Sequence, residues 1–213
     1  MLNLQYSFER YNANSNEAKQ SIVVKARVRD MEDVEAAVFD LTDSLGTQFT
    51  QEDVYFNTPQ GQLKLRIMHP NRCGALIYHS SEKSIGPKLS TSTLTEVEDV
   101  FSMRATLAAA LGELGVIRKR RRVFIAEDVR IYLDDVDDIG QFVDIAISCS
   151  AKEPGSCTKR AEEILRLLRI QQEDVVPAAY LDLMMDGLTL EGDEDKTSSV
   201  SSQTNSSDGS DGM

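Results

Sequence analysis

Basic side chains recur at a spacing of two residues in several segments of this sequence. The sets are Lys25 with Arg27, Lys64 with Arg66, Lys119 with Arg121, and Arg130 with Tyr132 and Asp134. Residues two positions apart in a β-strand point to the same face of a sheet. An ordinary antiparallel sheet with one solvated face explains any single strand of this kind. Four such strands in a chain with a formal net charge of −12 indicate a basic surface that binds an anion.

The identity of that anion follows from the shape that a large sheet can take. If the sheet curls into a barrel, its basic faces converge inside the barrel. Such an interior needs a highly charged anion to neutralise it, and a polyphosphate engages several Lys and Arg donors at once.

The elements that carry these residues follow from hydrophobic periodicity and from turn and cap residues. The predicted strands cover residues 22–28, 53–57, 62–68, 75–80, 116–126, 129–134 and 141–149. The predicted helices cover residues 31–45, 99–111, 157–168 and 176–186. A two-residue loop at Glu127-Asp128 would place Ala126 opposite Val129 and Arg121 opposite Asp134. Hairpins with interspersed helices predict an α+β fold on a large antiparallel sheet.

Length and composition predict one folded domain with two loose ends. The chain has 213 residues, of which 41% are hydrophobic, enough for a single core. We expect a loose segment at residues 1–19, the folded domain at 20–190, and a disordered, acidic, serine-rich tail at 191–213. No stretch is apolar enough to span a bilayer, and the N-terminus lacks the pattern of a signal peptide.

The cysteines and the charge balance limit which cellular compartment and which classes of partner we expect. Cys73, Cys149 and Cys157 have no metal-type spacing and form no even disulfide set, which predicts a reducing, intracellular environment. The cytoplasm is the expected compartment, with the nucleus as the alternative because residues 118–122 form a basic run. A pI near 4.6 argues against nucleic-acid binding, and a strand would split that run between two faces.

The ordered set of these motifs resembles the CYTH superfamily, the triphosphate tunnel proteins that include class IV adenylyl cyclases and thiamine triphosphatases. The matching segments are 24–28 (VKARV), 51–57 (QEDVYFN), 61–66 (GQLKLR), 86–88 (GPK), 118–122 (RKRRR), 129–134 (VRIYLD), 140–142 (GQF) and 179–183 (AYLDL). The resemblance implies an eight-stranded antiparallel barrel that encloses a tunnel. It also implies that basic tunnel residues hold a triphosphate. These residues are Lys25, Lys64, Arg66, Lys88, Lys119, Arg121 and Arg130, with Arg27 facing the same way.

The carboxylates that the resemblance implies are largely missing. Enzymes of this superfamily place acids on the first and last tunnel strands to bind Mg²⁺ or Mn²⁺, and those positions fall here on Ser21 and Val23 and on Asp144 and Ala146. Asp134 is a second candidate acid. Two carboxylates can hold Mg²⁺ when phosphates supply further ligands, so the sequence predicts a weakened Mg²⁺ or Mn²⁺ site at Asp144 and Asp134.

The sequence therefore predicts binding of a triphosphate-containing small molecule with metal-dependent catalysis impaired or lost. The ligand would be a nucleotide, thiamine triphosphate or inorganic polyphosphate. One alternative is an active metal-dependent triphosphatase or an enzyme like the adenylyl cyclases. The other is a non-catalytic scaffold that contacts an unidentified protein through its acidic tail.

Overall fold

The computed structural model describes residues 18–70, 73–81, 84–149 and 154–187, and the structural statements below concern these ranges. The tail predicted for residues 191–213 lies outside them, as does the loose N-terminal segment apart from residues 18 and 19. Both stay predictions. No helix within the described ranges is long and apolar enough to cross a membrane.

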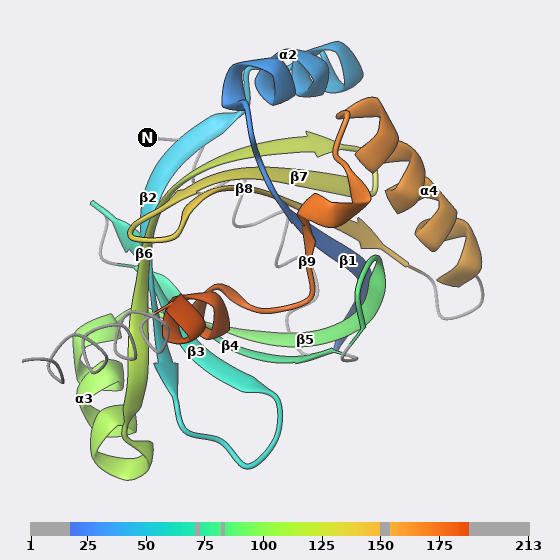
Figure 1. The fold of residues 1–213 in the computed structure, drawn as a ribbon. Helices are drawn as coiled ribbons and strands as arrows, with labels where there is room; N and C mark the ends of the chain where they lie inside the picture. The colour runs from blue at the N-terminus through green and yellow to red at the C-terminus, as the bar shows by residue number, and fades with distance from the viewer. Residues whose placement is uncertain (1–17, 71–72, 82–83, 150–153, 188–213) are drawn as a thin grey trace, which may run out of the picture.

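Eight antiparallel strands form a closed barrel, which confirms the predicted fold class. The strand order is β5-β4-β3-β2-β6-β7-β8-β1, and a pairing between β1 and β5 closes the ring (Figure 1). The strands are β1 (Lys19–Arg27), β2 (Thr47–Phe56), β3 (Gln62–His69), β4 (Gly74–Ser81), β5 (Lys88–Val97), β6 (Glu113–Ala126), β7 (Val129–Val136) and β8 (Gly140–Ser148). A short strand, β9 (Val175–Val176), joins the barrel at β1.

Strand β1 has three partners and forms the seam of the barrel. Along one edge it pairs with β8, from Ser21 opposite Ser148 to Arg27 opposite Phe142. Along its other edge, residues 19–23 pair with β5, and β9 then pairs with Lys25 and Ala26. Strand β9 thus continues the seam beyond the point where β5 leaves it.

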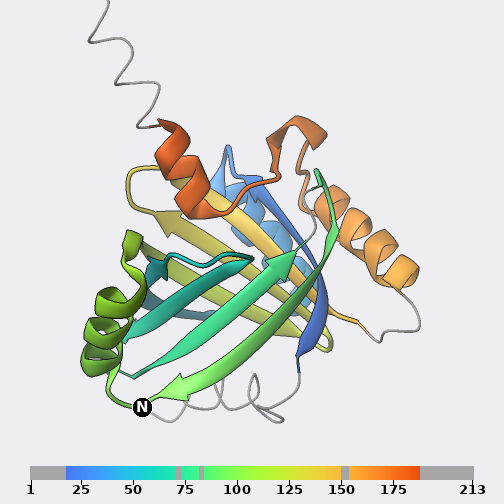
Figure 2. The ribbon, with the colours of Figure 1, turned by 90° about the horizontal axis from the view of Figure 1, so that it is seen from below.

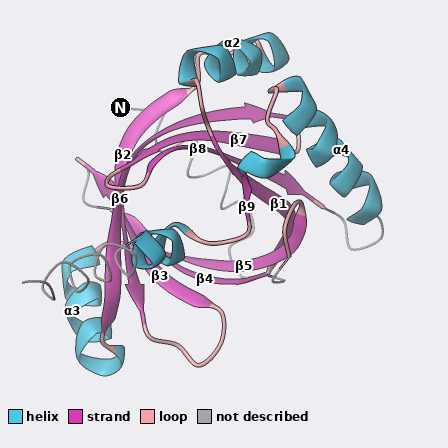
Figure 3. Cartoon of the chain, in the orientation of Figure 1, coloured by secondary structure: helices cyan, strands magenta, loops and turns pink. Residues whose placement is uncertain are grey.

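The main hydrophobic core lies outside the barrel wall, between the strands and two helices. Helices α2 (Met31–Thr42) and α4 (Pro154–Leu167) cover the wall on one side (Figure 1), and Figure 3 shows the same helices in cyan around the magenta strands. One face of β1 contributes Ile22, Val24 and Ala26 to this core. Because side chains alternate along a strand, the opposite face of β1, with Lys25, is directed into the barrel.

Two further apolar clusters complete the domain. Helix α3 (Val100–Leu111) covers β2 and β3, with Val100 packed near Val54 and Leu65. A second cluster lies at one end of the barrel interior, where residues 180–187 form a helix drawn in red in Figure 2. Its buried members are Tyr55, Ile117, Val136, Phe142, Tyr180 and Leu181. The segment after β9 therefore packs into this end of the barrel.

Several predicted boundaries are wrong. Helix α2 ends at Thr42 rather than at residue 45, because Asp43 adopts a left-handed conformation and its N–H caps the carbonyl of Phe39. Strand β2 begins six residues before the predicted start at residue 53. The helix predicted for residues 176–186 begins only at residue 180, because Val175 and Val176 pair with β1 as β9.

Strand β5 has no counterpart among the predicted strands. Half of its sequence, KLSTSTLTEV, is serine and threonine, and it has no apolar alternation. Its inward face carries Ser90 and Ser92, which stand opposite Ser21 and Lys19 of β1. Apolar alternation marks strands that pack on a core, and a strand lining a polar interior lacks that pattern.

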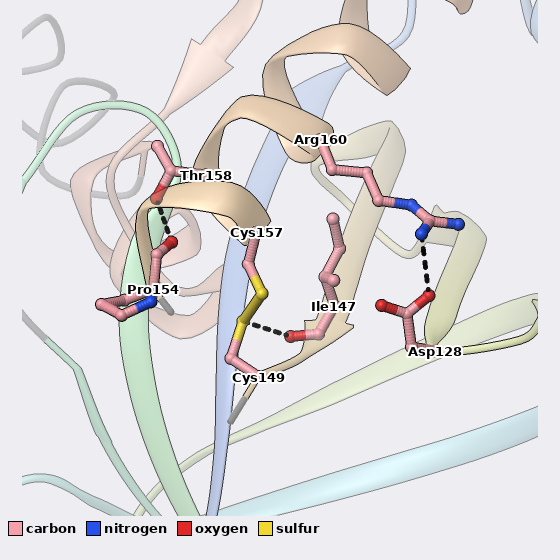
Figure 4. Close-up of a disulfide and its surroundings, with 7 residues drawn as sticks. All are labelled: Asp128, Ile147, Cys149, Pro154, Cys157, Thr158 and Arg160. Carbon is pink, nitrogen blue, oxygen red and sulfur yellow. Dashed lines mark hydrogen bonds and ion pairs between the residues drawn. A yellow bond between two sulfur atoms is a disulfide. The ribbon is translucent and has the colours of Figure 1, made fainter. Parts of the chain in front are cut away.

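A disulfide joins Cys149, directly after β8, to Cys157 in α4 (Figure 4). The expectation of reduced cysteines is therefore wrong for this pair, and the compartment inferred from it loses that support. The two Cα atoms lie 6.4 Å apart, inside the range of about 4.4–6.8 Å that a disulfide spans. Cys73 is exposed and free.

Candidate anion site inside the barrel

The inward faces of six strands bring charged side chains together inside the barrel. The bases are Lys25 from β1, Lys64 and Arg66 from β3, and Lys119 and Arg121 from β6, and the acids are Asp53 from β2, Asp134 from β7 and Asp144 from β8. These residues form two groups of ion pairs. The predicted convergence of basic residues is accompanied by a set of acids larger than the sequence indicated.

The first group is centred on Asp53, which the sequence analysis did not single out. Arg66 donates from Nε to Asp53 Oδ1 at 2.8 Å and from Nη2 to Oδ2 at 2.9 Å, and Lys64 Nζ donates to Oδ2 at 3.0 Å. The Asp53 side chain is 0% exposed. Burial favours its neutral form, but Arg66 and Lys64 outweigh burial and hold the pKa of Asp53 well below its usual value. Asp53 is therefore a charged partner that fixes two bases.

The second group is centred on Asp134. Arg121 donates to both of its oxygens at 2.6 Å, the Tyr180 hydroxyl donates to Oδ2 at 2.7 Å, and Lys119 Nζ lies 3.4 Å from the same oxygen. Burial works against its charge, yet Arg121 and Lys119 keep the pKa of Asp134 below its usual value. Tyr180 comes from the segment after β9, so this segment completes the group.

Asp144 forms an ion pair between β8 and β1, the strand at the seam. It stands opposite Lys25 in the β1–β8 register, and Lys25 Nζ donates to its Oδ2 at 2.8 Å. Arg121 Nη2 lies 3.6 Å from the same oxygen. The ammonium group of Lys25 also lies 3.9 Å from the centre of the Tyr180 ring, a cation–π arrangement. Lys25 is thus held by one carboxylate and one aromatic face.

Exposure separates the bases that a ligand can reach from those that it cannot. The side chains of Lys25, Lys64 and Arg66 are 15%, 19% and 19% exposed, whereas those of Lys119 and Arg121 are 2% and 6% exposed. Lys119 and Arg121 lie against Asp134 and are covered by Tyr180 and Tyr132, whose rings they face. Lys25, Lys64 and Arg66 are therefore the accessible bases of the interior.

The remaining predicted phosphate-binding residues form other hydrogen bonds. Arg27 is exposed, packs over the ring of Phe142 and donates to the carbonyl of Ile139. Lys88 Nζ donates to the carbonyl of Pro177 at 2.6 Å. Arg130 Nη1 donates to Ser148 Oγ at 3.4 Å. Lys88 nevertheless stands opposite Val23 in the β1–β5 register, and burial together with the charge of Lys25 lowers its pKa.

A half-buried histidine, His79, also belongs to the interior, although its sequence context did not single it out. One ring nitrogen of His79 lies 3.1 Å from Ser90 Oγ. Burial, assisted by the charge of Lys64, lowers the pKa of His79 to about 4. The ring is therefore neutral at physiological pH and offers a hydrogen bond rather than a charge.

The outward face of β6 shows why the basic run does not form one surface. Arg118 and Arg122 point away from the interior and pair with Glu52 and Glu35, each at 2.9 Å. Arg120 also points outward, to Asp135. The alternation splits the run between two faces as predicted, and the outward arginines are paired with acids. This disfavours a nucleic-acid surface.

The donor set of the interior does not fit a divalent metal ion. Both oxygens of Asp134 and both of Asp53 already accept hydrogen bonds from cationic groups. The described residues contain no group of three or more His, Cys, Asp or Glu side chains able to hold a metal. The buried amide oxygen of Gln51 has no hydrogen-bond partner in the described part of the chain, but it is a single neutral ligand beside Asp53.

The β1–β8 register locates the positions where acids would be needed. Ser21 stands opposite Ser148, Val23 opposite Ala146, and Lys25 opposite Asp144. The positions neighbouring Asp144 on this inward face therefore carry hydroxyl and hydrocarbon groups. Asp144 alone keeps a partly exposed carboxylate, at 23%.

Comparison with known proteins agrees with this architecture. The model of the CYTH domain matches residues 19–180. The chain belongs to the CYTH domain family. A protein of Methanocaldococcus jannaschii named "Putative adenylate cyclase" is 29% identical over an alignment of 147 residues that covers 62% of this chain and 80% of the relative.

Solved structures show the same fold. The PH1012 protein from Pyrococcus horikoshii is 26% identical, with a TM-score of 0.68 over 77% of this chain and 99% of the other. A structure from Vibrio parahaemolyticus, described as a "putative adenylate cyclase", is 17% identical with a TM-score of 0.65 over 79% and 99% of the two chains. This CYTH chain therefore has the barrel of the family.

Proposed function

We propose that this CYTH barrel binds a triphosphate-containing small molecule in its tunnel and that metal-dependent catalysis is impaired or lost. The observation that carries the binding proposal is the excess of bases over acids in a closed interior. Lys25, Lys64, Arg66, Lys119 and Arg121 are paired with only Asp53, Asp134 and Asp144. A polyanion would neutralise the remaining charge with several charge-assisted hydrogen bonds.

Three residues supply the direct contacts in this proposal. Lys25, Lys64 and Arg66 are the accessible bases, and each is oriented by a carboxylate before a ligand arrives. Such preorganisation lowers the ordering cost of binding. Lys119 and Arg121 add charge from behind Asp134 and Tyr180. Lys88, Arg130 and Arg27 lie outside this network, so we assign them longer-range attraction of the ligand.

The impaired catalysis rests on the engaged carboxylates. A metal-dependent phosphoryl reaction needs acids that can hold the ion against the phosphates. Asp53 and Asp134 are saturated by cationic donors, and Val23 and Ala146 stand where the resemblance places acids. The chain keeps the basic side chains that would bind phosphate and lacks most of the carboxylates that would bind a metal ion.

Calorimetric titration of the full chain with inorganic tripolyphosphate, ATP and thiamine triphosphate tests the proposal. At least one ligand should bind saturably without turnover. Lys64→Ala and Arg66→Ala should each weaken binding by about 1.5–3 kcal/mol, the range for hydrogen bonds to charged groups. Arg118→Ala removes the same type of charge from the outward face and should leave affinity nearly unchanged. Parent-like affinity in Lys64→Ala and Arg66→Ala would refute the assignment of the tunnel.

A second candidate is an active enzyme, and the name "Putative adenylate cyclase" of the relative from M. jannaschii favours it. Asp144, with its partly exposed carboxylate, is the acid on which such an activity would depend. The same titrations distinguish the two candidates when the products are analysed. Steady release of phosphate, pyrophosphate or cyclic AMP that Asp144→Asn abolishes would establish the enzyme.

A further inference from the structure

Among the described residues, the ion pairs inside the barrel involve three acids, Asp53, Asp134 and Asp144, and their contacts bear on the form of the ligand. Each oxygen of Asp53 and of Asp134 accepts a hydrogen bond from an arginine. A metal ion at either acid would have to displace a bidentate guanidinium, which breaks a buried ion pair and leaves a base uncompensated. Neither acid is therefore available to a divalent cation while the barrel is intact.

Asp144, the third acid, supplies too few ligands to hold a cation. Asp144 is partly exposed, but its Oδ2 accepts from Lys25, and Arg121 lies 3.6 Å away. Mg²⁺ prefers six oxygen ligands in octahedral geometry. A cation at Asp144 would meet one carboxylate and two positive side chains.

The charge balance of the interior completes the argument. The five bases exceed the three acids even before a ligand enters. A magnesium–polyphosphate complex carries less negative charge than the free polyphosphate, and its ion would add positive charge to a site that is already positive. Like charges in a low-dielectric interior repel strongly.

We infer that the tunnel takes its polyphosphate ligand free of metal, so that Mg²⁺ in solution competes with the protein for the ligand. This inference rests on the proposed function and specifies the ionic form of the ligand. It also provides regulation, because occupancy of the tunnel falls as free Mg²⁺ rises. In a barrel with a metal site, Mg²⁺ would instead strengthen binding.

The experiment titrates the full chain with inorganic tripolyphosphate in excess EDTA and in millimolar Mg²⁺, with ionic strength matched by sodium chloride. We expect the dissociation constant in Mg²⁺ to be larger by about tenfold or more, where tenfold corresponds to about 1.4 kcal/mol. An equal or smaller dissociation constant in Mg²⁺ would overturn the inference and leave the proposed function standing. No binding under either condition would overturn the proposed function, and the inference with it.

A paired variant makes the test independent of the chelation of the ligand in solution. Val23→Glu with Ala146→Glu places two acids on the inward faces of β1 and β8 beside Asp144. In this variant Mg²⁺ should strengthen binding, which reverses the sign seen in the parent. Gln20→Glu with Gln141→Glu adds the same charge to the outward faces of the same strands and should keep the parent's behaviour. If the inward variant unfolds, the parent titrations still decide the question.

Discussion

Arg121 and Asp134 face each other across neighbouring strands and form a bidentate ion pair inside the barrel, with both hydrogen bonds at 2.6 Å. Their side chains are 6% and 0% exposed. The adjacent residues on the same two strands, Arg120 and Asp135, form an ion pair on the outer surface, where the side chains are 67% and 38% exposed. The hairpin thus carries one ion pair on each face, in two very different environments.

Removing the inner arginine should destabilise the protein far more than removing the outer one. Arg121→Ala leaves Asp134 as a buried charge and should cost about 3–5 kcal/mol in the free energy of unfolding. Arg120→Ala removes an exposed pair and should cost less than about 1 kcal/mol. Urea denaturation measures both values. Similar losses in the two variants would show that the interior is well solvated.

Ligand affinity should depend on the protonation of Lys64. Burial lowers the pKa of Lys64 to about 8 against the opposing charge of Asp53, with Arg66 and Arg121 also nearby. A bound polyphosphate favours the charged lysine, so affinity is greatest below that pKa and declines as the pH rises through about 8. Calorimetric titration with tripolyphosphate at pH values from about 6.5 to about 9.5, a range that includes this pKa, should show the decline. Lys64→Arg, which stays charged, should flatten it.

Tyr180 should limit access to the deeper bases. Its hydroxyl donates to Asp134 at 2.7 Å, and its ring lies over both Lys25 and Lys119. Tyr180→Phe removes a hydrogen bond to a charged group and should lower stability by about 1.5–3 kcal/mol. Tyr180→Ala also uncovers Lys119, so the folded fraction should bind tripolyphosphate more tightly than Tyr180→Phe does. Weaker binding in Tyr180→Ala would make the ring part of the binding surface instead.

The disulfide should contribute to stability by constraining the unfolded chain. Closing the short loop between Cys149 and Cys157 is worth about 2.5 kcal/mol in the chain-entropy model. Cys157→Ser should lower the free energy of unfolding of the oxidised protein by a similar amount, which urea denaturation measures as a lower midpoint. Reductant should have the same effect on the parent. Cys73→Ser, which changes the free cysteine, should leave the midpoint unchanged. A parent that is insensitive to reductant would show that the bond does not form in solution.

The sequence predicts those parts of the fold that local periodicity determines. Alternation along residues 116–134 predicts the β6–β7 hairpin, and the structure confirms the expected register, with Ala126 opposite Val129 and Arg121 opposite Asp134. Asp30, the residue before the helix predicted at 31–45, caps α2. Strand β5 escapes prediction because its side chains line a polar interior or face solvent, so its position is set only by pairing with β4 and β1.

The sequence and the family resemblance indicate the bases of the site and two of its acids, Asp134 and Asp144, but they select neither Asp53 nor Tyr180. Asp53 lies at the start of the predicted strand, and nothing local shows that residues 47–52 continue it. The spacing of Gln51, Asp53 and Tyr55 was the available signal, since all three share one face of β2. The role of Tyr180 depends on β9, a strand of two residues that exists through its pairing with β1. Such long-range pairing leaves no periodic trace in the sequence.

The seam at β1 has a consequence for how the chain reaches this state. Lys25 and Asp144, which meet across the seam, are 119 residues apart in sequence, and bringing such distant segments together costs loop entropy before the contacts repay it. Folds dominated by distant contacts form slowly. We therefore expect strand β1 to pair with β5 and β8 after the sequential hairpins have formed. We expect ring closure to be a late event in folding, and chains paused before it to be the ones most prone to associate through open edges.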